Sequence, residues 1–220
     1  MLEAEPPGPA SASVILMHGL GADAGDLYPL PPVLGLPSDL HVRYVFPSAP
    51  RMRVSINMGM VMPAWYDIRS LGPEGQDESS IRRATGWIDE LIAREVDRGV
   101  PAHRIVLGGF SQGGAMALFT GLRYPQALAG VICMSGYLLL SDTLDAEAAA
   151  ANRKVPIFMA HGTADPMVDI SLGRRSRDHL LKAGYAVEWR EYPMAHQICG
   201  DELADIGRWL SALLAPAPRA

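Results

Sequence analysis

Ile105-Val-Leu-Gly-Gly-Phe-Ser-Gln-Gly-Gly-Ala115 is the stretch of sequence that decides the fold. Residues 105–110 form an apolar run of strand length, and a helical pattern follows from residue 115. Between them lies a Gly-x-Ser-x-Gly pattern, which is typical of a tight strand-to-helix turn that exposes a serine hydroxyl. Small residues at both flanks let the strand and the helix approach closely. We therefore predict that Ser111 is a nucleophile at the carboxyl edge of a sheet.

Further apolar runs and helical patterns alternate on both sides of this stretch. Such alternation predicts an α/β fold, with a mostly parallel central sheet and helices on both of its faces. Residues 136–156 are too few to form a separate cap domain, so we expect an open cleft. The predicted strands are residues 14–17, 42–46, 105–110, 131–135, 157–160 and 187–192, and the predicted helices are residues 80–98, 111–123, 172–183 and 201–214.

The ends of the chain are poor in residues that could build a core. Residues 1–12 are acidic and proline-rich, and residues 215–220 alternate alanine with proline. We expect a disordered lead-in over 1–12, a single domain over 13–214 and a flexible tail over 215–220.

The composition excludes several classes of function. Lys and Arg number 19 against 24 Asp and Glu, a net charge of −5, which argues against a nucleic-acid partner. The chain has no apolar run of roughly 18 residues, so we expect no membrane span, and its start does not resemble a signal peptide. The only two cysteines, Cys133 and Cys199, are read as free thiols of a reducing compartment, which favours the cytoplasm.

A serine nucleophile needs a base and an acid, which follow it along the chain in this type of fold. His196 lies in a loop between the last predicted strand and the last predicted helix, and it is the candidate base. Asp165 leaves the end of the preceding strand at a turn set by Pro166, and it is the candidate acid that orients the imidazole. Asp169 is the competing acid, although its position favours a helix N-cap. We assign His161, at the end of its strand, to structural hydrogen bonding.

Two backbone N–H groups are expected to stabilise the oxyanion, one from Gln112 and one from Leu20 in the loop after the first core strand. Residues 19–24 of that loop also match Gly-x-Gly-x-x-Ala, a dinucleotide-binding fingerprint, but residues 44–46 offer no acid where that fingerprint needs one. A metallohydrolase built from His18, His161, Asp165 and His196 is a further alternative, and no metal-ligand spacing supports it. We expect no metal and no organic cofactor.

The sequence resembles the carboxylesterase and acyl-protein thioesterase family of small α/β-hydrolases. The matching stretches occur in order over most of the chain: residues 16–22, 46–50, 64–68, 109–116, 159–165 and 192–196. The resemblance implies the α/β-hydrolase fold and places the nucleophile, acid and base on Ser111, Asp165 and His196. It likewise implies Leu20 and Gln112 as oxyanion donors, in agreement with the reading from the residues.

The resemblance further implies an acyl groove shaped by Trp65, Leu71, Val168 and Ile198. Near it, residues 58–62 alternate methionine with Gly59 and Val61, which predicts a short extended lid or hairpin. Met58 and Asp169 depart from the glycine and the proline usual in bacterial relatives.

We expect hydrolysis of small or lipid-like carboxylic esters with short to medium acyl chains. The alternatives are an acyl-protein thioesterase acting on an acylated protein, a lysophospholipase, and a catalytically silent binding module of the same fold. A homodimer is also expected, with the lid and the apolar loops as its contact.

Overall fold

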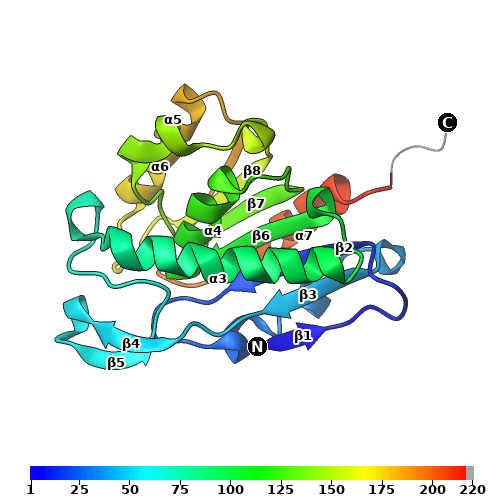
Figure 1. Ribbon diagram of the computed structural model, residues 1–220, viewed down its shortest axis with the longest axis horizontal. Coiled ribbons are helices and arrows are strands. Elements are labelled where there is room, and N and C mark those ends of the chain that lie inside the picture. Colours follow the sequence, from blue (N-terminus) through cyan, green and yellow to red (C-terminus); the bar gives the residue numbers. More distant parts are fainter. Residues whose placement is uncertain (217–220) are drawn as a thin grey trace.

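A seven-stranded sheet forms the centre of the computed structural model, which describes residues 1–216 (Figure 1). The strand order is β1-β3-β2-β6-β7-β8-β9, and all neighbours are parallel except β1 and β3. The fold class is thus confirmed. The strands are β1 (Leu2–Ala4), β2 (Ala12–Met17), β3 (Val42–Phe46), β6 (Ile105–Phe110), β7 (Gly130–Met134), β8 (Ile157–Gly162) and β9 (Val187–Tyr192).

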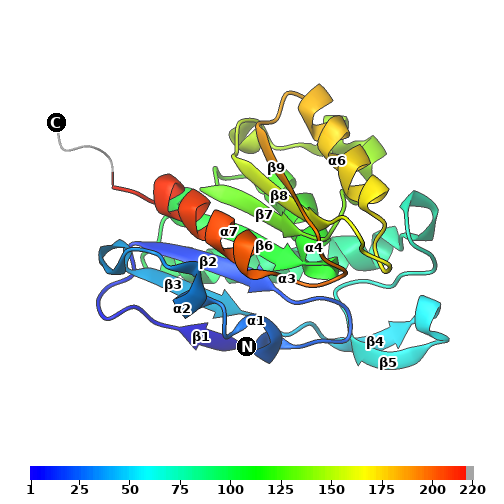
Figure 2. The ribbon, with the colours of Figure 1, turned by 180° about the vertical axis from the view of Figure 1, so that it is seen from behind.

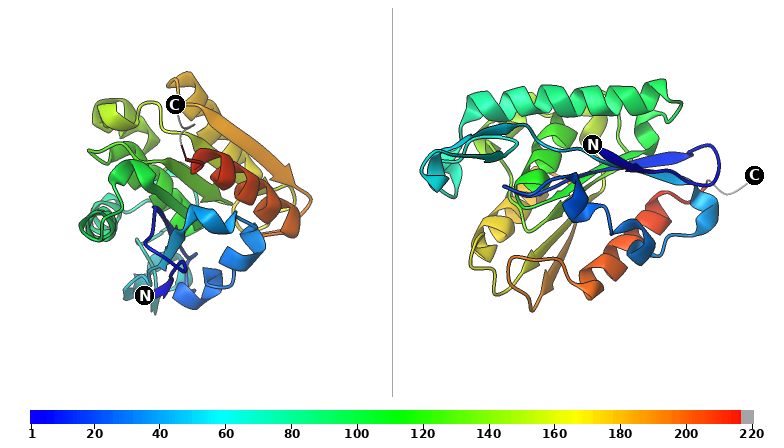
Figure 3. Two further views of the ribbon diagram at one scale, coloured as in Figure 1. Left: turned by 90° about the vertical axis from the view of Figure 1, so that its right-hand side faces the viewer. Right: turned by 90° about the horizontal axis from the view of Figure 1, so that it is seen from below.

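Helices cover both faces of this sheet, as the end-on view in Figure 3 shows. One hydrophobic cluster joins the sheet to α3 (Glu78–Asp97), α4 (Gln112–Arg123) and α6 (Ile170–Lys182). A second cluster joins the opposite face to α1 (Ala24–Leu27), α2 (Pro31–Leu34) and α7 (Gly200–Leu213), the helix in front of the sheet in Figure 2. A further short helix, α5 (Leu144–Glu147), lies in the connection between β7 and β8. Strands buried on both faces need apolar residues at nearly every position, as in β2, β6, β7 and β8. Residues 187–192 were expected to be buried in the same way, but β9 is an edge strand and most of its residues are partly or fully exposed.

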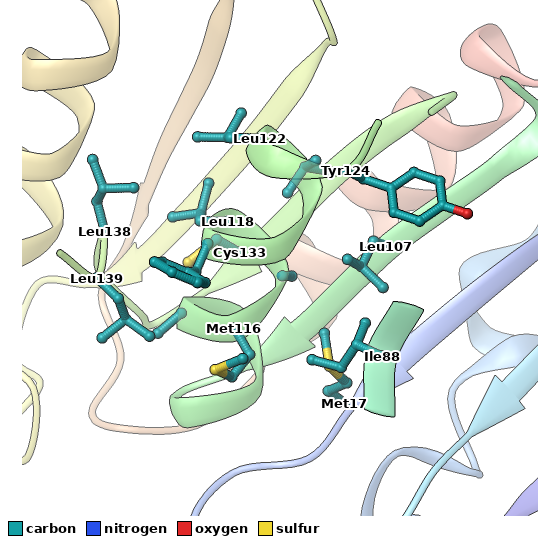
Figure 4. Close-up of a cluster of buried hydrophobic side chains, with 14 of the residues drawn as sticks. Met17, Ile88, Leu107, Met116, Leu118, Leu122, Tyr124, Cys133, Leu138 and Leu139 are labelled. Atoms are coloured by element: carbon teal, nitrogen blue, oxygen red, sulfur yellow. The ribbon is translucent and has the colours of Figure 1, made fainter. Parts of the chain in front are cut away.

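Helix α4 anchors the predicted turn around Ser111 to the hydrophobic core. It is buried along almost its whole length, and Met116, Leu118 and Leu122 pack among side chains of the sheet and of α3 (Figure 4). Helix α3 begins two residues earlier than its apolar pattern predicts, because the Asp77 carboxylate accepts a hydrogen bond from the Ser80 N–H at 3.1 Å.

The N-terminal segment corrects the expectation of a disordered lead-in. Residues 2–4 form β1, which pairs antiparallel with β3 along the edge of the sheet. Glu5 bonds Arg43 at 3.0 Å, and Arg43 in turn bonds the fully buried Glu95 at 3.0 Å. The segment is ordered because its acidic residues meet arginines from β3 and α3, partners that its own composition does not reveal. Part of the expected tail, residues 217–220, lies outside the described residues.

The segment between β3 and α3 contains the extended hairpin that the methionine alternation predicts. Strands β4 (Arg51–Val54) and β5 (Met60–Pro63) pair antiparallel and project beyond the main sheet (cyan in Figures 1 and 2). Met58 sits in the connecting turn with a φ of 55° and is 92% exposed. No helix within residues 1–216 is long and apolar enough to cross a membrane.

Glu202 in α7 makes the stability of the fold sensitive to pH. The residue is fully buried, and the backbone at Cys199 compensates the burial of its carboxylate only in part. Burial disfavours the charged form and raises the pKa of Glu202 from 4.5 to about 8. Between these two values the folded protein holds a proton that the unfolded chain releases, so this group's contribution to stability falls as the pH rises through that window.

Glu202→Gln is expected to be more stable than the unsubstituted protein at pH 8 and to lose that advantage towards pH 5. The substitution removes a pH dependence of the free energy of unfolding that is at most about 1.4 kcal/mol per pH unit. Denaturant unfolding of both proteins at pH 5 and pH 8 measures it, with Asp201→Asn at the exposed neighbouring position as the control. An equal response of Glu202→Gln and the unsubstituted protein to pH would contradict the assignment.

Candidate active site

Ser111 lies at the carboxyl end of β6 and at the N-cap of α4, where the sequence predicts a tight turn. Its backbone has φ 55° and ψ −118°, a conformation that residues with a side chain rarely adopt. The strained backbone is held by two hydrogen bonds, from the Ser111 N–H to the Met134 carbonyl at 2.7 Å and from the Ala115 N–H to the Ser111 carbonyl at 3.0 Å. The turn therefore presents the hydroxyl at the edge of the sheet.

The glycines of the motif are required by close backbone contacts. A Cβ atom on Gly113 would lie 2.1 Å from the Met17 carbonyl oxygen, and one on Gly109 would lie 2.4 Å from the Gly113 carbonyl carbon. Because both obstacles are backbone atoms, they cannot move aside as a flexible side chain could. The motif therefore has glycines at the positions where β2, β6 and α4 come into close contact and shape the turn.

His196 and Asp165 reach Ser111 from the loops that follow β9 and β8. His196 Nε2 lies 2.9 Å from Ser111 Oγ, and His196 Nδ1 lies 2.7 Å from Asp165 Oδ2. An ionised carboxylate only accepts, so Nδ1–H donates to Asp165 and Nε2 is free to accept from the serine hydroxyl. The imidazole also packs against Phe110, with ring centroids 4.7 Å apart.

The Asp165 side chain is fixed by its own loop. Its second oxygen, Oδ1, accepts hydrogen bonds from the N–H groups of Met167 and Val168 at 2.8 and 2.9 Å. His161, fully buried behind it, bonds through Nε2 to the Val168 carbonyl at 2.8 Å, and burial lowers the pKa of this imidazole. His161 therefore has the structural hydrogen bond that its position predicts.

Asp169, the competing acid, and His18, a candidate metal ligand, both have other hydrogen-bond partners. Asp169 caps α6, since its carboxylate accepts from the Ser171 N–H at 2.8 Å, and this bond lowers its pKa. His18 accepts from the Ala49 N–H at 3.0 Å through Nε2 and contacts the Gly19 carbonyl through Nδ1. Within residues 1–216, no three His, Cys, Asp or Glu side chains form a group suited to a metal ion.

Leu20 and Gln112 border the same cavity as Ser111. Gln112 is the first residue of α4, where an N–H group has no acceptor within its helix. Leu20 lies in a loop held by the Gly21 N–H, which donates to the Pro63 carbonyl of β5 at 2.8 Å. The buried Gln112 side chain has a role that the sequence did not reveal, because it bonds both the Trp65 N–H and the Tyr66 carbonyl at 2.8 Å.

The cavity beside Ser111 has a volume of about 320 Å³ and a largely apolar wall. Leu71 and Val168 border it, as the resemblance implies. The sequence did not single out its other apolar neighbours. Ala22, Tyr66, Ile68 and Phe110 lie within the matching stretches, whereas Ile56, Tyr137 and Met167 lie outside every motif.

Trp65 and Ile198 correct the expected acyl groove. The Trp65 side chain is 2% exposed, and its indole N–H donates to the His18 carbonyl at 2.9 Å, so it supports the loop from beneath. Ile198 packs against the hydrophobic cluster on the α7 face of the sheet. Neither residue borders the cavity, and neither does Met58.

The parallel sheet, the strained serine after a central strand and the histidine and aspartate from later loops define an α/β-hydrolase. The sequence matches the phospholipase/carboxylesterase family over residues 4–214. It is 39% identical to acyl-protein thioesterase 1 of Yarrowia lipolytica, over 91% of either chain. It is also 41% identical to acyl-protein thioesterase 1 of Neurospora crassa, over 93% of this chain and 87% of that one.

Comparison with solved structures gives the same fold. Arabidopsis thaliana SOBER1 superposes with a TM-score of 0.87 at 31% identity, over 92% of this chain and 99% of that one. Zea mays acyl-protein thioesterase 2 superposes with a TM-score of 0.86 at 27% identity, over 97% of this chain and 98% of that one. The chain belongs to the phospholipase/carboxylesterase family, and it is a serine hydrolase.

Proposed function

We propose that this enzyme cleaves carboxylic esters of short to medium acyl chains through an acyl-enzyme on Ser111. The observation that carries the proposal is the unbroken hydrogen-bond chain from Ser111 Oγ through His196 to Asp165, with distances of 2.9 and 2.7 Å. A serine hydroxyl of ordinary pKa becomes nucleophilic when an adjacent base removes its proton during attack. The same chain argues against a catalytically silent binding module, which has no need of this alignment.

In the proposed reaction, Ser111 Oγ attacks the carbonyl carbon and its proton passes to His196 Nε2. The N–H groups of Leu20 and Gln112 stabilise the oxyanion of the tetrahedral intermediate, assisted by the N-terminal dipole of α4. Asp165 stabilises the imidazolium, which then protonates the departing alcohol or thiol as its bond to carbon breaks. Water attacks the acyl-serine by the same route, and its proton passes through His196 to Ser111, which releases the acid.

The cavity supports an acyl group as the recognised part of the substrate. Its walls are largely apolar, which favours binding of hydrocarbon over polar groups and predicts broad rather than strict selectivity. Relatives that are 39% and 41% identical are named acyl-protein thioesterases, so a thioester on an acylated protein is the second candidate substrate. Lysophospholipid hydrolysis would use the same cavity.

We also propose a cytoplasmic location and a homodimer. Cys133 and Cys199 are both unpaired thiols, as suits a reducing compartment. Exposed apolar side chains offer surface for a contact between copies: Leu71 and Met167 border the cavity, and Met60 lies on the β4–β5 hairpin.

A panel of oxygen esters and thioesters of graded acyl length tests the proposed function. The purified protein is expected to hydrolyse several members of short to medium acyl length, because an apolar wall accepts neighbouring chain lengths without polar selectivity. A higher kcat/KM for thioesters across the whole panel would favour the second candidate. Hydrolysis no faster than that of the Ser111→Ala variant for every compound would contradict both.

A further inference from the structure

A second cavity of about 230 Å³ lies behind the wall of the first. It is bordered by Leu138, Ser141, Leu172, Arg175, Ser176 and His179, together with Tyr137. Tyr137 also borders the cavity beside Ser111, and no other residue belongs to both linings. The two cavities therefore meet at Tyr137.

We propose that Tyr137 determines the acyl chain length that the enzyme accepts, because its aromatic ring closes the far end of the acyl cavity. This inference rests on the proposed function, in which the acyl chain occupies the cavity beside Ser111. Tyr137 shares a hydrophobic cluster with three other residues of that cavity, Tyr66, Ile68 and Val168. This apolar side of the cavity suits hydrocarbon, whereas Asp26 and Asn57 belong to its polar lining.

The backbone around Tyr137 holds the ring in place. The N–H of Leu138 donates to Ser176 Oγ of α6 at 2.8 Å, and that hydroxyl donates to the Leu172 carbonyl at 2.8 Å. The N–H of Leu140 donates to Gln76 Oε1 at 2.8 Å, which ties the segment to the loop before α3. A partition fixed to two other segments cannot easily move aside for a longer chain.

The ring, rather than the hydroxyl, forms this partition. Tyr137 is 5% exposed, and its hydroxyl lies beyond the ring, near the Tyr66 side chain and the Gly72 backbone. Its removal in Tyr137→Phe leaves the partition standing, so this variant is the matched control.

Tyr137→Ala is expected to join the two cavities and to shift the optimum of kcat/KM towards longer acyl chains. Each additional methylene that can be buried raises kcat/KM by about four-fold, until the second cavity is filled. The measurement is kcat/KM across a series of saturated p-nitrophenyl esters, with Ser111→Ala as the blank. Tyr137→Phe is expected to keep the original optimum, whatever its effect on the rate. Tyr137→Leu tests the same opening if the alanine variant does not fold.

Leu172→Phe provides an independent check, because Leu172 borders only the second cavity. Alone it is expected to leave the chain-length profile unchanged, since the partition keeps that space out of use. Combined with Tyr137→Ala, it is expected to cancel the gain for long chains.

An unchanged chain-length profile in a folded Tyr137→Ala or Tyr137→Leu variant would overturn the inference, and so would a shifted optimum in Tyr137→Phe. In either case an inactive Ser111→Ala blank would leave the proposed function standing. Hydrolysis by the Ser111→Ala blank would instead contradict the proposed function itself.

Discussion

Replacing Ser111 with alanine is expected to lower kcat for ester hydrolysis by on the order of 10⁴-fold or more. The substitution removes the one atom that forms the covalent bond to the acyl group. It leaves the oxyanion donors and the cavity in place, so KM is expected to change much less than kcat. The measurement is steady-state hydrolysis of a short p-nitrophenyl ester by the purified variant.

Ser135→Ala is the matched control for this prediction. Ser135 is also a fully buried serine with a positive φ, 48°, directly after the neighbouring strand β7. Its hydroxyl has no hydrogen-bond partner among the described residues. We expect Ser135→Ala to retain its activity within a few-fold. Equal losses in the two variants would show that the effect of Ser111→Ala is structural.

Replacing Asp165 with asparagine is expected to lower kcat by on the order of 10⁴-fold, the loss seen when the orienting acid of such a group is made an amide. The asparagine oxygen can still accept from the N–H groups of Met167 and Val168, so the loop is retained. Its NH₂ group then faces His196 Nδ1 and donates to it, which moves the imidazole proton to Nε2. An Nε2 that carries a proton cannot take another from Ser111.

Asp169→Asn separates this effect from a general loss of acidic charge. Asparagine caps a helix about as well as aspartate, so α6 should keep its start. We expect kcat within a few-fold of the unsubstituted protein, and thermal unfolding of both variants verifies that they fold. If Asp165→Asn were as active as Asp169→Asn, the proposed role of Asp165 would be wrong.

The elements of the fold that were predicted correctly are those determined by residues close together along the chain. A continuous apolar run predicts a strand buried on both faces, and β6 has the predicted range and that burial. β9 also has the predicted range, but it is the partly exposed edge strand of the sheet and carries charged residues. The proximity of Ser111, Asp165 and His196 followed from a general rule, that the carboxyl ends of parallel strands meet at one edge of a sheet.

The parts that the sequence did not predict depend on partners distant along the chain. The segment that contains β1 is held by Arg43 of β3 and Arg94 of α3, and nothing within residues 1–12 identifies these partners. The resemblance implies that Trp65 is a groove residue, but a hydrogen bond from its indole N–H to the His18 carbonyl holds the side chain in the core. Tyr137 has no motif at all, and its place between two cavities emerges only from the packing of β7, α6 and the loop before α3.

The central claim is that Ser111 is activated by His196 and Asp165. Reaction with a fluorophosphonate tests it most directly, because only an activated serine is phosphonylated readily. Mass spectrometry of the digested protein is expected to find the adduct on the peptide that contains Ser111, with labelling slowed in Asp165→Asn and abolished in Ser111→Ala. A folded protein that stays unlabelled, or one that carries the adduct on another residue, would contradict the account.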